Sequence, residues 1–245
     1  MIRPLYTTVD DVLLTGREWF TGEVPEAAVV LVHGFSASTE DPKVCRVAEA
    51  LQADGLDVVA YDARGHGRSE GASTLGDLER HDVAAAVDVA RERSERVVLV
   101  GASMGAIAVL RYAASIDDPE SLAGVVTVSC PAQWRLPRNA RGMLAAALTR
   151  TPPGRAVASR LMRVQVAPRW TNPEPPIDLV PRITCPIAVI HGSADRFVAP
   201  GDAAKLHAVA NSPRRIELVP DLGHAFEPES IPAVRDAVAW VLAQP

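Results

Sequence analysis

Short apolar runs that alternate with longer helix-patterned stretches constrain the fold of this chain more than any other feature of its sequence. Runs of about four to eight residues, rich in β-branched side chains and bounded by Gly or Pro, are typical of strands buried on both faces of a parallel sheet. Six such runs predict strands at 28–32, 57–61, 96–100, 124–129, 187–191 and 215–219. Helix-period stretches predict helices at about 42–53, 78–91, 104–114, 202–210 and 231–242. This order predicts an α/β fold with a mostly parallel sheet.

Two segments depart from the alternation. Residues 7–20 alternate loosely between apolar and polar side chains and contain Thr15-Gly16, which predicts an antiparallel hairpin at one edge of the sheet. Between residues 131 and 178 the chain has eight prolines and only short helical stretches. A long insertion without a strand predicts a lid over the edge where open α/β sheets bind ligands. We therefore expect a core of residues 1–130 and 181–245 and a lid insertion at 131–180.

The composition argues against several classes of function. The 245 residues suffice for one hydrophobic core, and 48% hydrophobic with 22% charged residues is near the average for globular proteins. A formal net charge of −5 gives no basic field for nucleic acid, and no zinc-ligand spacing occurs. No apolar run has the length of a signal peptide or membrane helix, and the three cysteines form no CxxC pair. We expect a cytoplasmic protein with no nucleic-acid, membrane or metal partner, and its oligomeric state stays open.

The segment Gly101-Ala102-Ser103-Met104-Gly105 fits the pattern G-x-S-x-G and lies between an expected strand and an expected helix. A sharp turn of this kind lifts a serine Oγ above the sheet edge, and glycines at the flanking positions let neighbouring backbone pass closely. The helix that follows directs free N–H groups toward an anion formed at the serine. A tight turn with an incidental serine is the structural alternative. The position between strand and helix favours Ser103 as a nucleophile.

A serine nucleophile needs an imidazole base that is itself held by a carboxylate. His224 lies in a loop after the last strand, which should open on the same sheet edge as Ser103. Asp195 lies four residues beyond the strand at 187–191, and we expect it to orient His224. Asp221 is the rival carboxylate, but it is better placed to cap a turn. Structural or solvated roles are expected for the other five histidines, which are His33, His66, His81, His191 and His207.

The negative oxygen of a tetrahedral intermediate needs preorganised donors. We expect the backbone N–H groups of Met104 and of Phe35, at the end of the first parallel strand, to form this oxyanion hole. Candidates for an apolar substrate pocket in the lid are Trp134, Met143, Leu161 and Trp170, although packing within the lid explains them equally well.

The lid also has an unbalanced charge. Between residues 131 and 178 there are eight arginines and only two acidic residues, Glu174 and Asp178. One interpretation is a basic lid that favours anionic substrates such as an acid ester or a CoA thioester. The simpler interpretation, which we prefer, is an arginine face that is solvated and screened.

These residues resemble the α/β-hydrolase superfamily over essentially the whole chain, from about residue 28 to residue 242. Its successive signatures are matched by His33-Gly34-Phe35, the glycine-rich run from Asp62 to Ser69, the turn at 101–105, Gly192-Ser193-Ala194-Asp195 and Gly223-His224. Within the superfamily, the pattern is similar to small esterases of the serine aminopeptidase and cinnamoyl esterase type. The resemblance implies an eight-stranded, mostly parallel sheet and hydrolysis without a cofactor. The serine at 103 excludes, by resemblance, the dehalogenases and epoxide hydrolases that use an aspartate nucleophile.

We therefore expect a serine hydrolase that cleaves small-molecule carboxylic esters through an acyl-enzyme on Ser103. The same triad would also serve an acyl thioesterase or a hydrolase of a carbon–carbon bond beside a ketone. A ligand-binding receptor with slow or no turnover is the alternative of another class. Acyl and alcohol preference stay open.

Overall fold

One sheet of eight strands forms the centre of the molecule in a computed structural model that describes residues 2–22, 24–116, 122–134, 140–169 and 171–244. The strands are β1 (Ile2–Thr7), β2 (Leu13–Trp19), β3 (Ala28–Val32), β4 (Asp57–Tyr61), β5 (Val97–Ala102), β6 (Gly124–Val128), β7 (Ile187–Gly192) and β8 (Arg214–Val219). Their order is β1-β2-β4-β3-β5-β6-β7-β8. β1 and β2 are antiparallel to each other, β2 is antiparallel to β4, and the remaining pairs are parallel. The predicted eight-stranded, mostly parallel α/β fold is confirmed.

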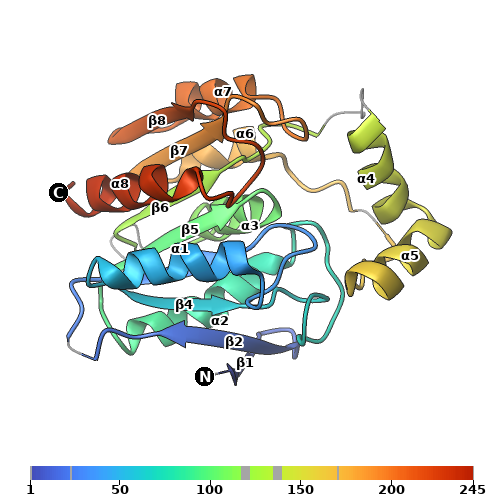
Figure 1. The fold of residues 1–245 in the computed structure, drawn as a ribbon, viewed down its shortest axis with the longest axis horizontal. Coiled ribbons are helices and arrows are strands. Elements are labelled where there is room, and N and C mark those ends of the chain that lie inside the picture. Colours follow the sequence, from blue (N-terminus) through green and yellow to red (C-terminus); the bar gives the residue numbers. More distant parts are fainter. Residues whose placement is uncertain (1, 23, 117–121, 135–139, 170, 245) are drawn as a thin grey trace.

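Helices cover both faces of this sheet. α1 (Pro42–Ala53) and α8 (Ser230–Leu242) pack on one face, where Figure 1 shows them in front of the strands. α2 (Glu79–Arg91), α3 (Met104–Ala113) and α7 (Gly201–Val209) pack on the other, together with the short α6 (Pro176–Leu179) and the 3₁₀ turn Val180–Arg182. Every residue of β3, β4, β5, β6 and β7 is buried, because each of these strands has helices on both sides.

The N-terminal hairpin exists, but its turn is not at the predicted place. Gly16 lies within β2, paired with Arg3 and with Tyr61, so Thr15-Gly16 is extended strand. The chain reverses instead at residues 8–12. There the backbone N–H of Asp11 donates to the carbonyl of Thr8, and the Thr8 Oγ1 accepts from the N–H of Val12. The side-chain hydrogen bonds of Thr8 form this turn, and a pattern that looks only for glycine misses it.

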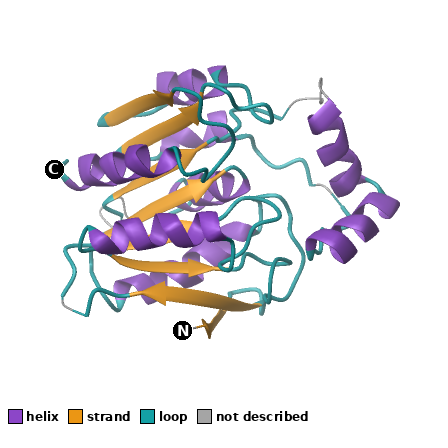
Figure 2. Cartoon of the chain, viewed as in Figure 1, coloured by secondary structure: helices purple, strands orange, loops and turns teal. Residues whose placement is uncertain are grey.

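Two helices stand apart from the sheet layers. Figure 2 shows α4 (Ala140–Arg150) and α5 (Pro152–Met162) beyond the end to which the parallel strands point. Thr151 caps α5, since its Oγ1 accepts from the N–H of Gly154 at 3.1 Å. After α5 the chain returns along the loop that follows β4, where Gln165 exchanges hydrogen bonds with Gly65 and Ser73. None of the helices in the described ranges has the length and apolar character needed to span a lipid bilayer.

Candidate active site

Ser103 lies in a strained turn between β5 and α3. Its backbone angles are φ 52° and ψ −111°, a combination that few non-glycine residues adopt. A Cβ on Gly101 would lie 2.5 Å from the Gly105 carbonyl oxygen, and a Cβ on Gly105 would lie 2.4 Å from that of Val32. Both positions therefore require glycine for space, as the pattern G-x-S-x-G predicts.

Three side chains that are far apart in the sequence meet at this turn. His224 Nε2 lies 3.0 Å from Ser103 Oγ, and His224 Nδ1 lies 2.7 Å from Asp195 Oδ2. The Asp195 side chain is fully buried, whereas 21% of the His224 side chain is exposed. The rival carboxylate is not part of this chain of contacts, because Asp221 sits in the turn before His224, where its backbone N–H donates to Ser193 Oγ. The structure thus brings together Ser103, His224 and Asp195.

Close packing of two loops places the acid beside the base. A Cβ on Gly192, at the end of β7, would lie 2.2 Å from the carbonyl oxygen of Leu222 in the loop after β8. The N–H of Ala194 donates to that same carbonyl at 3.0 Å. Ser129, directly after β6, accepts from the N–H of Ala225 through its Oγ at 3.1 Å. Ser129 therefore fixes the loop that carries His224. Ser129 was not predicted as a site residue from the sequence, and its position at a strand end is the one signal that could have found it.

The carboxylate of Asp195 has a donor at nearly every lone pair. Oδ1 accepts from the backbone N–H groups of Phe197 and Val198, at 2.8 and 3.0 Å. Oδ2 faces His224 Nδ1 and also His191 Nε2, which is 3.3 Å away. Burial alone would raise the pKa of Asp195, but hydrogen bonds from His191, from His224 and from the Val198 N–H hold this pKa well below its ordinary value. Asp195 is therefore an anion at neutral pH, and its charge holds the His224 Nδ1–H in place.

The segment proposed to complete an oxyanion hole is fixed by a buried histidine. His33 Nδ1 contacts the Gly34 carbonyl oxygen at 2.8 Å, and His33 Nε2 accepts from the Ala63 N–H at 2.9 Å. Burial lowers the pKa of His33, in keeping with a neutral ring. The ideal Cβ of Gly34 would lie 3.3 Å from the Ala102 carbonyl oxygen, so this segment runs against the turn of Ser103. Met104 is the first residue of α3, and its N–H therefore has no partner within the helix.

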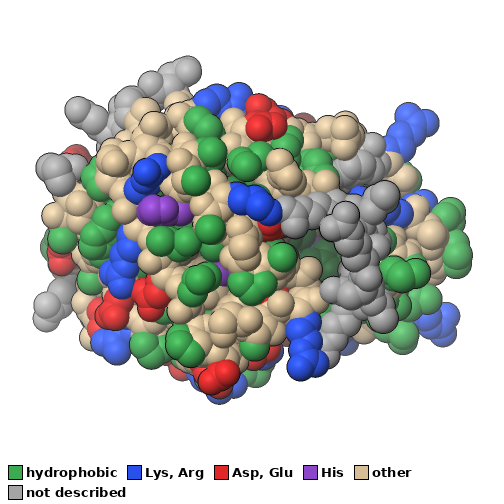
Figure 3. Space-filling view, turned by 90° about the horizontal axis from the view of Figure 1, so that it is seen from above, with side chains coloured by type: hydrophobic (Ala, Val, Ile, Leu, Met, Phe, Trp, Pro, Cys, Tyr) green, Lys and Arg blue, Asp and Glu red, His purple; other side chains and the backbone are tan. Residues whose placement is uncertain are grey.

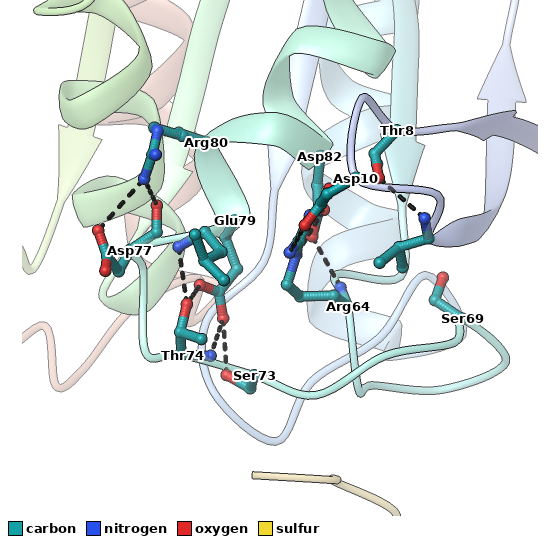
Figure 4. A network of polar contacts seen from close by, with 12 residues as sticks. Thr8, Asp10, Arg64, Ser69, Ser73, Thr74, Asp77, Glu79, Arg80 and Asp82 are labelled. Carbon is teal, nitrogen blue, oxygen red and sulfur yellow. Dashed lines mark hydrogen bonds and ion pairs between the residues drawn. The ribbon is translucent and has the colours of Figure 1, made fainter. Parts of the chain in front are cut away.

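Asp62 and Glu79 hold the loops that surround this edge. The buried Asp62 carboxylate accepts from the N–H and Oγ1 of Thr39 and from the N–H of Arg68, which joins the loops after β3 and β4. The Glu79 carboxylate, at the start of α2, accepts from residues of the preceding loop (Figure 4). Ser73 in that loop also contacts Met104 Sδ, at 3.4 Å. The carboxylate of Asp62 therefore gives the glycine-rich run from Asp62 to Ser69 a structural role.

The three predicted lid residues that the structure describes differ in their surroundings. Trp134 packs against the core, and its indole Nε1 donates to the Pro173 carbonyl oxygen. Met143 and Leu161 are 61% and 76% exposed, and Trp170 lies outside the described residues. A cavity of about 180 Å³ lies between the end of α4, residues 73–75 and residues 166–169, and none of the three described candidates lines it. Within the described residues, no group of three or more His, Cys, Asp or Glu side chains is arranged to hold a metal ion.

Solved structures with the same fold come from several organisms. The esterase Pf2001 of Pyrococcus furiosus aligns with a TM-score of 0.74 at 22% identity, over 99% of this chain and 91% of that one. Est1E of Butyrivibrio proteoclasticus, solved with ferulic acid bound, aligns with a TM-score of 0.71 at 19% identity, over 100% and 98%. These likenesses confirm the fold.

Sequence comparison gives the family. The uncharacterised protein YfhR of Escherichia coli K12 is 26% identical over 227 residues, which are 89% of this chain and 72% of that protein. A thiohydrolase of Aspergillus aculeatus, aneE, is 38% identical over 66 residues, which are 27% of this chain and 20% of that protein. The model of the dienelactone hydrolase family matches residues 145–243, and the model of the serine aminopeptidase S33 family matches residues 23–174, well over half of the chain. The chain therefore belongs to the serine aminopeptidase S33 family of α/β-hydrolase enzymes.

Proposed function

We propose that this protein hydrolyses carboxylic esters of small molecules through an acyl-enzyme on Ser103. The observation that carries the proposal is the continuous chain of contacts from Ser103 Oγ through His224 to Asp195, at 3.0 and 2.7 Å. A hydroxyl with an imidazole at hydrogen-bond distance, itself held by a buried carboxylate, is the arrangement that makes serine a nucleophile at neutral pH.

The reaction proceeds in two steps. Ser103 Oγ attacks the ester carbonyl carbon while His224 Nε2 takes its proton, and the tetrahedral intermediate then expels the alcohol, which receives that proton. In the second step a water molecule attacks the acyl-enzyme, His224 takes a proton from the water, and Ser103 leaves with it as the acid is released. The backbone N–H groups of Met104 and Phe35 would stabilise the negative oxygen of both intermediates, each by about 3 kcal/mol.

The helical hairpin of α4 and α5 would form a lid over this site, as part of an insertion at 131–180 beside a core of 1–130 and 181–245. Its place beyond the carboxyl ends of the parallel strands supports this role. Figure 3 shows hydrophobic and basic side chains at the end of the molecule that these helices occupy. Met143 and Leu161, which are exposed on these two helices, would then be available to contact substrate.

An acyl thioesterase with the same triad is the second candidate. It is favoured by the likeness of 66 residues of this chain to part of a thiohydrolase. The chemistry is the same except that a thiolate leaves instead of an alkoxide. A set of 4-nitrophenyl esters and acyl-CoA thioesters with the same acyl groups would separate the two, since the preferred class should show the higher kcat/KM at every chain length.

A fluorophosphonate probe tests the nucleophile directly. We expect the wild-type protein to be labelled and inactivated in proportion, Ser103→Ala to be neither labelled nor active, and Ser115→Ala, an exposed serine after α3, to behave as wild type. An unlabelled wild type that still binds esters without turnover would contradict the proposal and favour a ligand-binding receptor on the same fold.

A further inference from the structure

His191 is a fully buried histidine that the reaction steps above do not use. It lies near the end of β7, four residues before Asp195, with no exposed surface. Its Nε2 is 3.3 Å from Asp195 Oδ2 and also 3.3 Å from the Val198 carbonyl oxygen. Its Nδ1 is buried and has no hydrogen-bond partner among the described residues.

These contacts determine which nitrogen carries the proton. Both atoms near Nε2 are acceptors, so an unprotonated Nε2 would place three lone pairs against one another. A proton on Nδ1 would be a buried donor without an acceptor, which costs about 1–3 kcal/mol. The ring is therefore neutral, with its single proton on Nε2, shared between Asp195 and Val198.

Asp195 Oδ2 then accepts from two imidazoles. His224, in the loop after β8, donates through Nδ1 at 2.7 Å. His191, in strand β7, donates through Nε2. With Oδ1 already held by the N–H groups of Phe197 and Val198, all four donors fix the plane of the carboxylate. Removing the His191 donor leaves His224 as the one donor of these four on Oδ2, so the plane of the carboxylate is fixed less firmly relative to His224.

We propose that His191 is a positioning residue of the active site, whose Nε2–H fixes the carboxylate of Asp195 in the orientation that holds His224 toward Ser103. The inference rests on the proposed function, because it concerns the same three side chains. His191 touches neither the nucleophile nor the reacting atoms, and it acts only through Asp195.

Two substitutions distinguish the effect of the Nε2–H donor from the effect of the volume of the ring. His191→Phe keeps most of the volume and removes the donor, and we expect kcat to fall by about tenfold to a hundredfold with KM nearly unchanged, the loss that a slightly misplaced catalytic group causes. His191→Gln can place an amide N–H where Nε2 was, and we expect it to recover most of kcat. Val126→Ala, a buried change in the neighbouring strand β6 and away from Asp195, serves as the control for lost stability.

Nuclear magnetic resonance of protein labelled with ¹⁵N-histidine gives a readout that does not depend on turnover. We expect the spectrum of the wild-type protein to show His191 as the neutral Nε2–H form and to show the downfield Nδ1–H proton of His224. His191→Phe should broaden or shift the His224 proton, whereas Val126→Ala should leave it unchanged.

The results distinguish a failure of the proposed function from a failure of the positioning role of His191. A wild type without esterase activity or labelling would contradict the proposed function, and the tautomer of His191 and the response of the His224 proton would still decide the inference. An active wild type with a His191→Phe variant of equal kcat, or a His191 that carries its proton on Nδ1, would overturn the positioning role. A loss of kcat in His191→Phe that does not recover in His191→Gln, and that Val126→Ala reproduces, would also overturn it.

Discussion

Position 105, in the first turn of α3, requires glycine because there is no room for a side chain, more than because of its backbone angles. A Cβ there would lie 2.4 Å from the Val32 carbonyl oxygen and 2.6 Å from that of His33, and neither backbone atom can move without displacing β3. We expect Gly105→Ala to lower the free energy of unfolding by about 1–3 kcal/mol and to slow labelling of Ser103 by a fluorophosphonate at least tenfold, since the nucleophile turn must shift.

Gly201→Ala is the matched control for that substitution. Gly201 also begins a helix, α7, but nothing lies within 4 Å of the position that a Cβ would take. Urea unfolding should show an unchanged or slightly raised stability, because alanine restricts the unfolded chain. Equal unfolding midpoints for Gly105→Ala and wild type would mean that the turn yields more easily than the close contacts imply.

A site residue could be predicted from the sequence where it follows a strand that the sequence also predicts. Ser103, Asp195 and His224 each follow a strand that the apolar pattern identifies, so the parallel sheet brings them to one edge. Ser129 and His191 could not be assigned, because their contacts depend on how the loops after β7 and β8 fold against each other. That packing is a property of the tertiary structure, which leaves no regular pattern in the sequence.

At the scale of elements, the start of α2 depends on one buried carboxylate. Glu79 accepts hydrogen bonds from Ser73 Oγ, from both the N–H and the Oγ1 of Thr74, and from the N–H of Gly76, which closes the loop before the helix. Glu79→Gln replaces one acceptor oxygen with an NH₂ group that faces donors. We expect a loss of about 1–3 kcal/mol in urea unfolding. Asp88→Asn, on the exposed side of α2, should leave the midpoint within about 0.5 kcal/mol of wild type. Equal behaviour of the two variants would show that the loop is held by other contacts.

The arginine-rich insertion leads to a prediction about substrate charge. Its described arginines at 150, 160, 163 and 169 are exposed, so we expect added salt to screen them without selective effect. Raising the salt concentration from about 0.05 M to about 0.5 M should change kcat/KM for mono-4-nitrophenyl glutarate and 4-nitrophenyl valerate by the same factor, within about twofold. A fall for the anionic ester alone would mean that the arginines attract anionic substrates.

The elements themselves were predictable where burial on both sides gives an apolar run. The observed bounds of β3, β4 and α1 match those expected from sequence, because Gly, Pro and Asp41 delimit them. The hairpin turn was placed wrongly, since Thr8 closes it through its own side chain. The insertion shows neither the apolar run of a buried strand nor a long stretch with helical spacing. Its pocket residues therefore could not be assigned from the sequence.

At the scale of the whole molecule, Arg64 joins three parts of the chain. Its guanidinium pairs with Asp10 in the turn between β1 and β2 and with the buried Asp82 of α2, and Figure 4 shows the two carboxylates meeting it. The hydrogen bonds of Arg64 hold the pKa of Asp10 well below its ordinary value of 3.8, although partial burial opposes them. Burial raises the pKa of Asp82 to about 7, against the opposing effect of Arg64. The two shifts therefore act in opposite directions, because the raised pKa of Asp82 lowers stability as the pH rises from about 4 to about 7, whereas the lowered pKa of Asp10 lowers stability as the pH falls below about 4.

Asp10→Asn tests the ion pair between Asp10 and Arg64 through the pH dependence of the free energy of unfolding. Because the pKa of Asp10 is lower in the folded state, its stabilising contribution is present above about pH 4 and is lost as the pH falls through the folded pKa. We expect the variant to be less stable than wild type near pH 6, by about 1 kcal/mol for a pair whose acid is partly exposed, and the two unfolding curves to converge below about pH 2. Asp236→Asn, on the exposed surface of α8, should show no such convergence. A constant gap between Asp10→Asn and wild type from pH 6 to pH 2 would mean that Asp10 acts through packing, and that its charge contributes nothing to holding the hairpin against α2.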